Sequence, residues 1–563
     1  MRWALTMIVA GALALPTSAL AQDSSSSFSQ LTGDSGCVSQ EPPLPGDEDA
    51  PDGCARARGL LNAWTVAVSP DDKNVYVASA GGSDAVAAFS RAGDTGALTA
   101  IGCVSDSGGD GRPGTDGFCA NGDALLGASG IVVSPDGRHV YVSSHSSNGV
   151  TWLARDAAGK LTSAGCIKNY PRADRCRAGF GLEGTSGVAV SPDGKNVYVT
   201  ADLPGSVSVF SRDAETGNLE PVMCVSENGS DGLCADGTAL QGASSVVVAP
   251  DGRQVFVTAD VIGGVTAYAR DAATGALTPQ SCLLDKAPKG GSCTSAPRLA
   301  GAAASAITPD GKTLLVASSD DQALALFARN ADTGALTPAG CVKHQDPQGD
   351  DAVDAEEEFE DEEEAEEAQA DCTPAKALYA PREVVVSSDG RGVFAVGGDS
   401  LAAFRRDPGS GRVTQTGCAE AERSYKSCSE TRNAFEPRGI AASSDARSLY
   451  VTSDSDNAVS VFGAAVAVQS RAATADRRGR FRVRLACPAA RVSGCAGRLR
   501  VGAAKARAYR VRAGARRAVK ARLGKRLRRV VRKRGRARVI VAARDSRGLM
   551  RASTRRLLVR RAR

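Results

Sequence analysis

The chain has 563 residues, of which 42% are hydrophobic and only 4% aromatic, and its formal net charge is +5. After the first residues no apolar stretch approaches the roughly 20 residues that cross a bilayer as a helix, so we expect no transmembrane segment. With three histidines and no CxxC pair among its 16 cysteines, the sequence also lacks the ligand spacing of a structural zinc site. We therefore predict no metal and no cofactor.

Residues 1–21 have the features of a secretory signal peptide. Arg2 supplies a positive start, residues 4–15 are apolar, and Ala19-Leu20-Ala21 is a small-residue cleavage site. The sequence therefore predicts a secreted, extracytoplasmic protein whose mature chain begins near Gln22.

Residues 22–466 contain one pattern seven times. Each copy has a short anchor ending in aspartate, and successive anchors lie 56 to 65 residues apart, except for one spacing of 79 that contains an acidic insertion. A fixed period of this kind indicates a repeat architecture. The anchors are Ser69-Pro70-Asp71, Ser134-Pro135-Asp136, Ser191-Pro192-Asp193, Ala249-Pro250-Asp251, Thr308-Pro309-Asp310, Ser387-Ser388-Asp389 and Ser443-Ser444-Asp445.

One copy predicts four short strands, at 187–191, 196–200, 206–210 and 218–225, with Pro192-Asp193-Gly194 as the first turn. An isolated sheet of four strands cannot bury both faces, and it gains a core by stacking on its neighbours around an axis. The fold class is therefore all-β: a seven-bladed β-propeller of four-stranded blades.

The two ends of the propeller are expected to meet. The last copy supplies three strands, within residues 439–462, and residues 31–38 resemble the fourth-strand sequence at 98–104. We predict that the N-terminal strand completes the seventh blade, which leaves no unpaired edge in the ring.

The segments 188–200 and 207–210 resemble the YVTN-type repeat of the lactonase-like propellers, a family that includes phosphogluconolactonases; the resemblance covers residues 28–466. It implies a site at the mouth of the central tunnel, where such enzymes place histidine, arginine and acidic side chains to polarise a lactone and activate water. Fold resemblance alone does not establish activity.

The residues just before the predicted innermost strands are mostly small and neutral. Only Pro381-Arg382 and Pro437-Arg438 match the family's Pro-Arg sequence at this place, and two arginines can bind a carboxylate or phosphate through paired hydrogen bonds. A structural ion pair is the alternative role for each. The other five are Ala63-Trp64, Ser129-Gly130, Ser186-Gly187, Ser244-Ser245 and Ala303-Ala304.

The sequence assigns no catalytic residue with certainty, and the candidates are Arg382, Arg438 and His145. His145 falls in a loop between the second and third strands of its blade, and its ordinary pKa suits a general base, but the sequence places no partner beside it. We expect His139, which lies in a Pro-Asp-Gly hairpin, and His344, beside the acidic insertion, to be ordinary surface residues.

The 16 cysteines form eight couples of near neighbours, which predicts disulfides in an oxidising compartment. Each of the first seven lies in or beside the connection that leads into the next blade. We expect the main role of these disulfides to be stabilisation of the fold, because they constrain the loops. The alternative is that they hold the loops in shape as a rim that binds a ligand. The predicted couples are Cys37 with Cys54, Cys103 with Cys119, Cys166 with Cys176, Cys224 with Cys234, Cys282 with Cys293, Cys341 with Cys372, Cys418 with Cys428, and Cys487 with Cys495.

Acidic residues gather in a few loops. Residues 346–371 hold 15 carboxylates and no lysine or arginine, so we expect a disordered acidic insertion over 344–371, with binding of a cation or a basic partner as the alternative. The Asp- and Gly-rich loops 106–116 and 228–236 lack the order of ligands found in an EF-hand, and we expect solvated turns.

Residues 471–563 carry 34 lysines and arginines against Asp476 and Asp545, a net charge of +32 that leaves −27 on the rest of the chain. Apolar residues alternate with basic ones at 481–485, 498–501 and 509–512, and 538–541 is mainly apolar, so we predict a small, basic β-sandwich, with 525–534 as a short helix or hairpin.

So basic a surface attracts polyanions. The partners expected outside the cell are anionic envelope polymers or lipid headgroups, and docking onto the chain's own acidic insertion is the alternative. We expect no physiological nucleic acid, because the protein is exported and no aromatic stacking platform accompanies the charge.

Three functions remain open at this point. The leading one is a non-enzymatic binding or scaffold protein, in which the propeller rim recognises a ligand and the basic domain holds the molecule near anionic envelope material. The alternative is a lactone hydrolase that uses the candidate residues at the tunnel mouth. A self-associating component of a surface layer is the third.

Overall fold

A computed structural model describes residues 28–31, 35–40, 53–346 and 372–561, with short gaps at 94, 112–114, 170–174, 204, 228, 423, 426–427, 465–466, 469–471, 487–494, 502–506, 513–515, 535 and 546–552. The predicted signal peptide at 1–21, most of the acidic insertion (347–371) and Cys487 lie outside the described residues.

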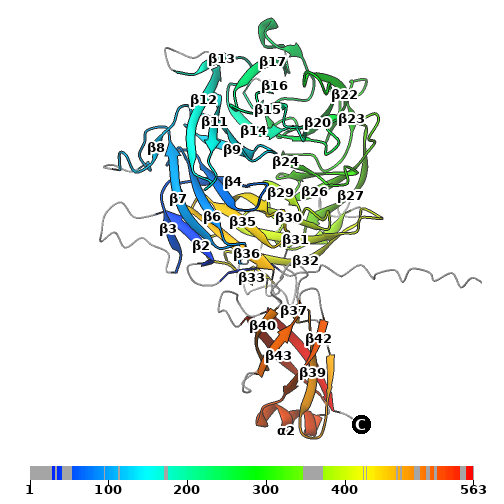
Figure 1. Ribbon diagram of the computed structural model, residues 1–563. Helices are drawn as coiled ribbons and strands as arrows, with labels where there is room; N and C mark the ends of the chain where they lie inside the picture. The colour runs from blue at the N-terminus through cyan, green and yellow to red at the C-terminus, as the bar shows by residue number, and fades with distance from the viewer. Residues whose placement is uncertain are drawn as a thin grey trace, which may run out of the picture.

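Seven sheets stand around a common axis, as the sequence predicts, and the first four strands of each are antiparallel (Figure 1). Blade 1 comprises β4 (Ala63–Val68), β5 (Asn74–Ser79), β6 (Ala85–Arg91), β7 (Leu98–Ser105) and β8 (Ala120–Asn121). Blade 2 comprises β9 (Ala128–Val133), β10 (His139–Ser144), β11 (Gly149–Arg155), β12 (Leu161–Asn169) and β13 (Arg177–Gly179). Blade 3 comprises β14 (Thr185–Val190), β15 (Asn196–Ala201), β16 (Ser206–Arg212), β17 (Leu219–Ser226) and β18 (Ala235–Asp236), with the 3-10 turn η2 (Gly229–Gly232) before β18.

The remaining blades follow the same order along the chain. Blade 4 comprises β19 (Ala243–Val248), β20 (Gln254–Ala259), β21 (Gly264–Arg270), β22 (Leu277–Leu284) and β23 (Thr294–Ser295). Blade 5 comprises β24 (Ala302–Ile307), β25 (Thr313–Ser318), β26 (Ala323–Arg329), β27 (Leu336–His344) and β28 (Thr373–Ala375). Blade 6 comprises β29 (Glu383–Val386), β30 (Gly392–Gly397), β31 (Ser400–Arg406), β32 (Val413–Glu420) and β33 (Ser429–Glu430). Blade 7 comprises β34 (Pro437–Ala442), β35 (Ser448–Ser453) and β36 (Ala458–Ala464), with β1 (Phe28–Gln30), β2 (Cys37–Gln40) and β3 (Ala55–Ala57).

Each blade has a short fifth strand that the sequence does not predict. It pairs in parallel with the fourth strand, as β13 does with β12. The loop between them therefore leads the chain back, so that both strands run in the same direction. A disulfide joins the fourth strand to the segment entering the fifth, for example Cys166 to Cys176. Two or three residues are too few to show the alternation by which a strand is recognised, so only the folded loop reveals them.

The N-terminal segment closes the ring. In the sheet of blade 7, β2 pairs with β36, placing Cys37 opposite Ser460 and Val38 opposite Val459, and β1 pairs further along the same strand. The side chain of Gln30 donates to the carbonyl of Arg432 and to the Ser460 hydroxyl. The innermost strands complete the circle, because β34 of blade 7 lies beside β4 of blade 1.

The anchor aspartates found in the sequence bind the blades to one another. At six of the seven blade interfaces, an arginine at the end of the third strand reaches back to the anchor aspartate of the preceding blade; blade 7 ends its third strand at Ala464 and supplies no arginine. The pairs are Arg91–Asp445, Arg155–Asp71, Arg212–Asp136, Arg270–Asp193, Arg329–Asp251 and Arg406–Asp310.

Buried tyrosines extend four of these contacts. The Arg212 Nε donates to the Tyr141 hydroxyl at 2.8 Å, and that hydroxyl donates to the carbonyl of Gly217 in the next blade. Arg91, Arg155 and Arg270 make the same contact with Tyr450, Tyr76 and Tyr198. Each such contact therefore joins two neighbouring blades through an arginine and a tyrosine.

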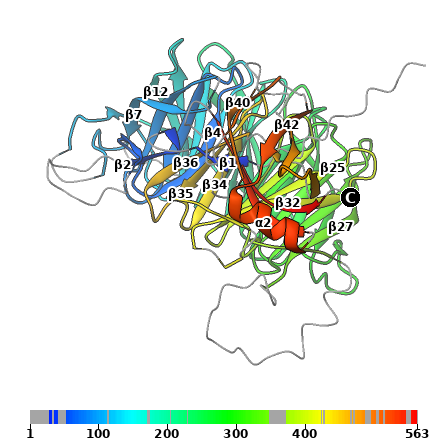
Figure 2. The ribbon, with the colours of Figure 1, turned by 90° about the horizontal axis from the view of Figure 1, so that it is seen from below.

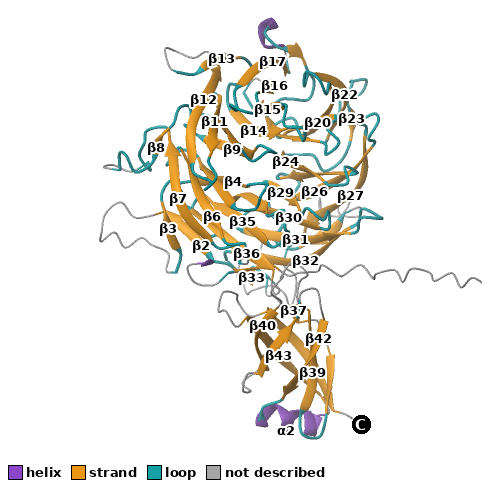
Figure 3. Ribbon diagram, viewed as in Figure 1, coloured by secondary structure: helices purple, strands orange, loops and turns teal. Residues whose placement is uncertain are grey.

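Residues from 467 onward form a separate two-sheet sandwich. One sheet has the order β37 (Ala467–Val468), β39 (Arg480–Ala486), β42 (Arg516–Arg522). The other has the order β38 (Ala472–Ala475), β44 (Ser553–Arg561), β43 (Arg536–Asp545), β40 (Cys495–Val501), β41 (Arg507–Val511). The region 525–534 is a helix, α2 (Lys525–Arg534), rather than a hairpin (Figure 3).

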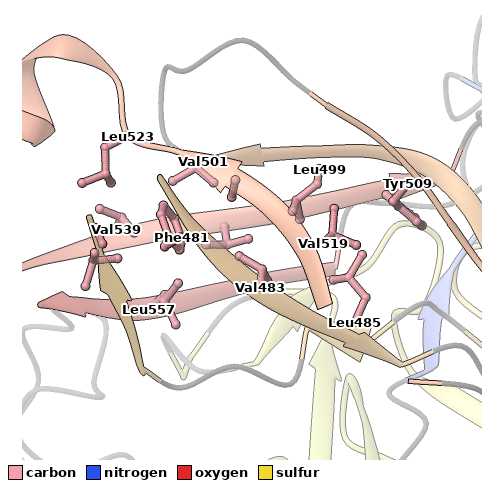
Figure 4. Close-up of a cluster of buried hydrophobic side chains, with 14 of the residues drawn as sticks. Phe481, Val483, Leu485, Leu499, Val501, Tyr509, Val519, Leu523, Val539 and Leu557 are labelled. Carbon is pink, nitrogen blue, oxygen red and sulfur yellow. The ribbon is translucent and has the colours of Figure 1, made fainter. Parts of the chain in front are cut away.

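Alternation of side chains builds the sandwich. Val483 and Leu485 face inward from β39 while Arg482 and Arg484 face outward, and the inward residues of both sheets meet in one apolar core around Phe481 (Figure 4). The sandwich lies beyond the outer strands of the ring, near β33 and β36 in Figure 1, and Figure 2 shows it from below with α2 toward the viewer. Among the described residues, no helix is long and apolar enough to span a membrane.

Candidate functional site

One face of the propeller carries both the disulfide-stapled connections and the turns between second and third strands. The amide of His145 donates to the carbonyl of Gly127, and that of Asp202 donates to Gly184, so these turns lie against the connections that enter the innermost strands. Both elements lie at one end of the innermost strands, which follow one another around the axis of the ring. We call this end the tunnel mouth, and it is where the sequence predicts a site.

A single position near the start of each innermost strand differs among the blades. In blade order its residues are Trp64, Ser129, Ser186, Ser244, Ala303, Arg382 and Arg438. We expected all of them to precede the strands, but most lie inside them; only Arg382 comes before its strand, because β29 begins at Glu383. The large side chains fall in blades 6, 7 and 1, which are neighbours in the ring.

The three serines at this position have a structural role. Ser129 donates to the carbonyl of Thr185 in the next blade, Ser186 donates to Ala243, and Ser244 donates to Ala302. Each hydroxyl therefore joins one innermost strand to the next.

Arg438 is held in place by three neighbours. Its Nε donates to the Asp454 carboxylate at 2.7 Å, and its Nη2 lies 4.0 Å from the Glu436 carboxylate. Its guanidinium also lies over the Trp64 ring, 4.6 Å from the ring centroid. The structure therefore shows the ion pair that we named as the alternative role for this arginine.

Arg382 lies close to Arg438 on the neighbouring blade. Partial burial and the positive charge of Arg438 lower the pKa of Arg382, although Asp454 and Glu436 oppose this effect. Among the residues that the structure describes, no carboxylate lies within ion-pair distance of Arg382. A negatively charged group on a ligand would relieve the repulsion between the two guanidinium groups.

Glu383 is a functional candidate that the sequence analysis missed. It follows Arg382 directly, and burial raises its pKa to about 7, although the Val384 amide donates to its carboxylate at 3.0 Å. A carboxyl group that titrates near neutral pH in a protein cleft is typical of a general base. Aligning the repeats reveals the signal: the corresponding residue in the other blades is Gly, Ser, Thr or Ala.

The three histidines have different surroundings. His145 Nε2 lies 3.2 Å from Asp202 on the next blade, so it does have a partner at the tunnel face, although it lies in blade 2 while the arginines lie in blades 6 and 7. His139 is not the surface residue that we expected: it is buried against Arg212, and burial together with that charge lowers its pKa. His344 lies between Tyr379 and Tyr425, and burial lowers its pKa.

The three blades after that of His145 each place a carboxylate in the turn between the second and third strands. Asp202, Asp260 and Asp320 occupy equivalent turns of blades 3, 4 and 5, and burial together with the other two charges raises the pKa of Asp260. Acidic side chains thus occupy this turn in blades 3 to 5, whereas on blades 6 and 7 arginines stand beside carboxylates such as Asp454 and Glu436. Within the described residues, no group of three or more metal-ligating side chains is close enough to hold an ion.

The loop 106–116 is more than the solvated turn that we expected. Asp110 is fully buried and accepts hydrogen bonds from Gln40 of β2 and from Arg58. The carboxylate is kept there because it ties the loop of blade 1 to the strand that closes blade 7. Loop 228–236 contains η2 and β18.

Seven of the eight predicted cysteine couples are disulfides in the structure, one at each blade. The bonds join Cys37 to Cys54, Cys103 to Cys119, Cys166 to Cys176, Cys224 to Cys234, Cys282 to Cys293, Cys341 to Cys372, and Cys418 to Cys428. The eighth couple, Cys487 with Cys495, includes a residue outside the described part and stays a prediction. So many disulfides are typical of proteins that fold outside the reducing cytoplasm.

The disulfides support the rim of the tunnel face but supply no side chain to the arginine-bearing part of the mouth. Each bond holds the loop after a fourth strand against that strand, as Cys103 and Cys119 do in blade 1 and Cys341 and Cys372 do at the base of the acidic insertion. The sequence analysis named two roles for them, and the observed pairing fits stabilisation of the loops.

Large apolar side chains stand exposed around the mouth. Leu203 is 66% exposed, Val261 69% and Tyr379 53%, and Ile262, Phe435 and Leu126 are also exposed in turns of the same face. Grouped exposed apolar residues mark binding surfaces more often than isolated ones do.

Fold and site together define a seven-bladed β-propeller with two neighbouring arginines at one end of its innermost strands and an added basic sandwich. Residues 183–348 match the family model described as lactonase, 7-bladed beta-propeller, and this match confirms the predicted resemblance to the lactonase-like propellers. The matched segment spans blades 3 to 5.

Several solved structures are similar to the chain. The periplasmic gluconolactonase of Pseudomonas aeruginosa is 20% identical over 72% of this chain and 98% of that one, with a TM-score of 0.45. A protein of Bacteroides fragilis assigned to the 6-phosphogluconolactonases is 15% identical over 72% and 96%, with a TM-score of 0.45. Hydrazine synthase of Kuenenia stuttgartiensis is 16% identical over 75% and 99%, with a TM-score of 0.44. No curated protein matches the chain significantly in sequence.

Proposed function

We propose that the chain is an exported lactone hydrolase whose site is the arginine-bearing part of the tunnel mouth. The observation that carries the proposal is the closeness of two cationic donors, Arg382 and Arg438, on neighbouring blades, with Glu383, a carboxyl group whose pKa is about 7, next to Arg382 in the chain. The match to the lactonase family model supports the choice of substrate class.

Each residue has a role that suits its chemistry. Arg382 and Arg438 donate hydrogen bonds to the lactone carbonyl oxygen and stabilise the negative charge that develops on it. The Glu383 carboxylate accepts a proton from water as the water oxygen bonds to the carbonyl carbon. When the ring C–O bond breaks, Glu383 returns that proton to the leaving oxygen, and the product is a hydroxy acid.

The test is hydrolysis of a panel of sugar and aliphatic lactones by the full-length protein. We expect Glu383→Gln and Arg382→Ala each to lower kcat/KM by roughly 10²- to 10⁴-fold, which is the usual contribution of a general base or an oxyanion donor. Ser244→Ala, at the equivalent position of blade 4, is the control and should retain activity. The wild-type rate should rise with pH through a midpoint near 7, the pKa of Glu383.

Absence of turnover across the panel, or unchanged turnover in Glu383→Gln, would overturn the hydrolase proposal. His145 is a further candidate, and His145→Ala tests it in the same assay. We expect full activity in that variant because His145 is paired with Asp202 on another part of the mouth.

A second function is favoured by two other observations. The mouth has a rim of exposed apolar residues, and the C-terminal sandwich exposes basic residues from most of its strands. We propose that the exported protein, its signal peptide being residues 1–21, also binds anionic envelope material through 471–563. Retention on such material should fall in high salt and after deletion of 471–563, and unchanged retention in either case would contradict it.

A further inference from the structure

A small pocket in the C-terminal sandwich is lined by several arginines. It has a volume of about 270 Å³ and lies between α2, the turn that joins β38 to β39, and the end of β44. Arg477 contributes from the turn, Arg528 and Arg532 from the helix, and Arg561 from β44. The other lining residues are Ala475, Asp476, Gly479, Leu523 and Val531.

The positive charge in this pocket is not neutralised by the surrounding protein. Asp476 is the one acidic lining residue, and its carboxylate is already engaged by the Arg480 side chain at 2.7 Å and by two backbone amides of the turn. In the described part of the chain, no carboxylate lies within ion-pair distance of the four lining arginines. Four arginines and one aspartate give the lining a net charge of about +3.

The helix and the turn hold the pocket in shape. Val531 is buried in the core of the sandwich, and Leu527 and Val530 pack against the same core, which fixes the face of α2 that carries Arg528 and Arg532. Gly479 lies so close to the helix that a β-carbon there would be 3.1 Å from the Arg528 side chain. The Leu523 amide donates to the Gly479 carbonyl at 2.9 Å and joins the turn to the strand that precedes the helix.

We propose that this pocket binds the dianionic phosphate group of a phosphate monoester. A tetrahedral phosphate presents oxygens to several guanidinium groups at once, whereas a carboxylate is satisfied by one. The pocket is large enough for a phosphate with a short polyol attached, and the absence of an aromatic residue from its lining disfavours a nucleobase. The inference goes beyond the lactone site, which lies on the propeller.

The phosphate has two sources that share this chemistry, a soluble ester and a lipid headgroup. Isothermal titration with glycerol 3-phosphate tests the first, and flotation with vesicles of phosphatidylcholine containing phosphatidic acid tests the second. Binding in either arm supports the proposal and identifies the source, and binding in neither would overturn it.

A variant pair separates the pocket from the general charge of the domain. Arg528→Gln with Arg532→Gln should weaken binding by about 10-fold or more, as expected when charge-assisted hydrogen bonds are lost. Arg498→Gln with Arg500→Gln removes the same charge from the exposed face of β40 and should change affinity less than about 3-fold. Equal losses in both variants would mean that diffuse charge binds phosphate, and the pocket proposal would fail.

A measurement on the wild type does not depend on how the variants fold. Dimethyl phosphate has the same tetrahedral centre but a single negative charge and two blocked oxygens. We expect it to bind about 10-fold more weakly than glycerol 3-phosphate. Equal affinity for the two esters would contradict recognition of a dianion.

Discussion

At the scale of residues, Glu383 shows how much a single side chain depends on its surroundings. Its sequence neighbourhood is an ordinary start of a strand, yet burial raises its pKa from the usual 4.5 to about 7. Since one pKa unit corresponds to about 1.4 kcal/mol, the folded protein favours protonated Glu383 by up to about 3 kcal/mol. A carboxyl group with this cost is retained more readily at a site than in a purely structural position.

This predicts a pH-dependent effect of Glu383→Gln on stability. Because the folded pKa lies above the unfolded one, the stabilising contribution of the protonated group is complete below pH 4.5 and is lost as the pH rises through 7. The variant should match the wild type at pH 4 and exceed its free energy of unfolding by up to about 3 kcal/mol at pH 8. Denaturant unfolding at the two pH values measures the difference, and an equal effect at both would refute the raised pKa.

At the scale of elements, the repeat anchors act between blades rather than within them. The Arg212 side chain is 1% exposed and contacts Asp136, Tyr141 and the Gly194 carbonyl. Burial of Asp136 opposes its ionisation, but hydrogen bonds from Ser134, the Arg138 amide and Arg212 lower its pKa to about 2. The Ser134 hydroxyl thus orients the carboxylate that the arginine of the next blade binds.

Arg212→Ala should lower the free energy of unfolding by about 2 to 3 kcal/mol, because it leaves a partly buried carboxylate without its partner. Arg253→Ala is the matched control: its pair with Asp332 is 63% and 88% exposed and should contribute less than about 1 kcal/mol. Urea unfolding of both variants checks the contrast. The Arg212 variant should also lose less stability than the wild type between pH 4 and pH 2, since the depressed pKa of Asp136 depends in part on that arginine.

At the scale of the whole molecule, the ring depends on its first strands. Leu31 and Val38 are buried in the core between blades 7 and 1, and Gln40 accepts a hydrogen bond from the Leu60 amide while donating to Asp110. The closing segment therefore contributes apolar contacts, buried hydrogen bonds and the Cys37–Cys54 disulfide together.

Deletion of residues 22–40 should lower the free energy of unfolding by more than about 5 kcal/mol, the sum expected from two buried apolar side chains and one disulfide. The control is Cys37→Ser with Cys54→Ser, which removes the disulfide and keeps the strand, and it should cost about 2 to 4 kcal/mol. Thermal and denaturant unfolding measure both. If the deletion cost no more than the control, strand closure would not be a main source of stability.

The architecture could be predicted from the sequence because it depends on local patterns that recur at a fixed period. The seven anchors indicate turns and blades, alternating residues indicate strands, and close cysteine couples indicate disulfides. None of these inferences requires knowing which blades are in contact. The same kind of alternation predicted strands at 481–485 and 498–501 of the sandwich, but it missed β42 and β44, whose arginine-rich sequences show few apolar residues. The helical state of 525–534 was left open because only its packing on the core, through Val531, decides it.

The candidate site could be predicted from the sequence only in part. Arg382 and Arg438 could be singled out because the same Pro-Arg pair occurs in two neighbouring repeats, whereas their closeness, the raised pKa of Glu383 and the His145–Asp202 contact arise between blades. Burial and charge at a tunnel mouth come from residues that are dozens to hundreds of positions apart in the chain. The sequence by itself determined the repeat and its secondary structure, since these depend on neighbouring residues; the tertiary structure alone decided the electrostatics of the site, because an electric field depends on distance in space.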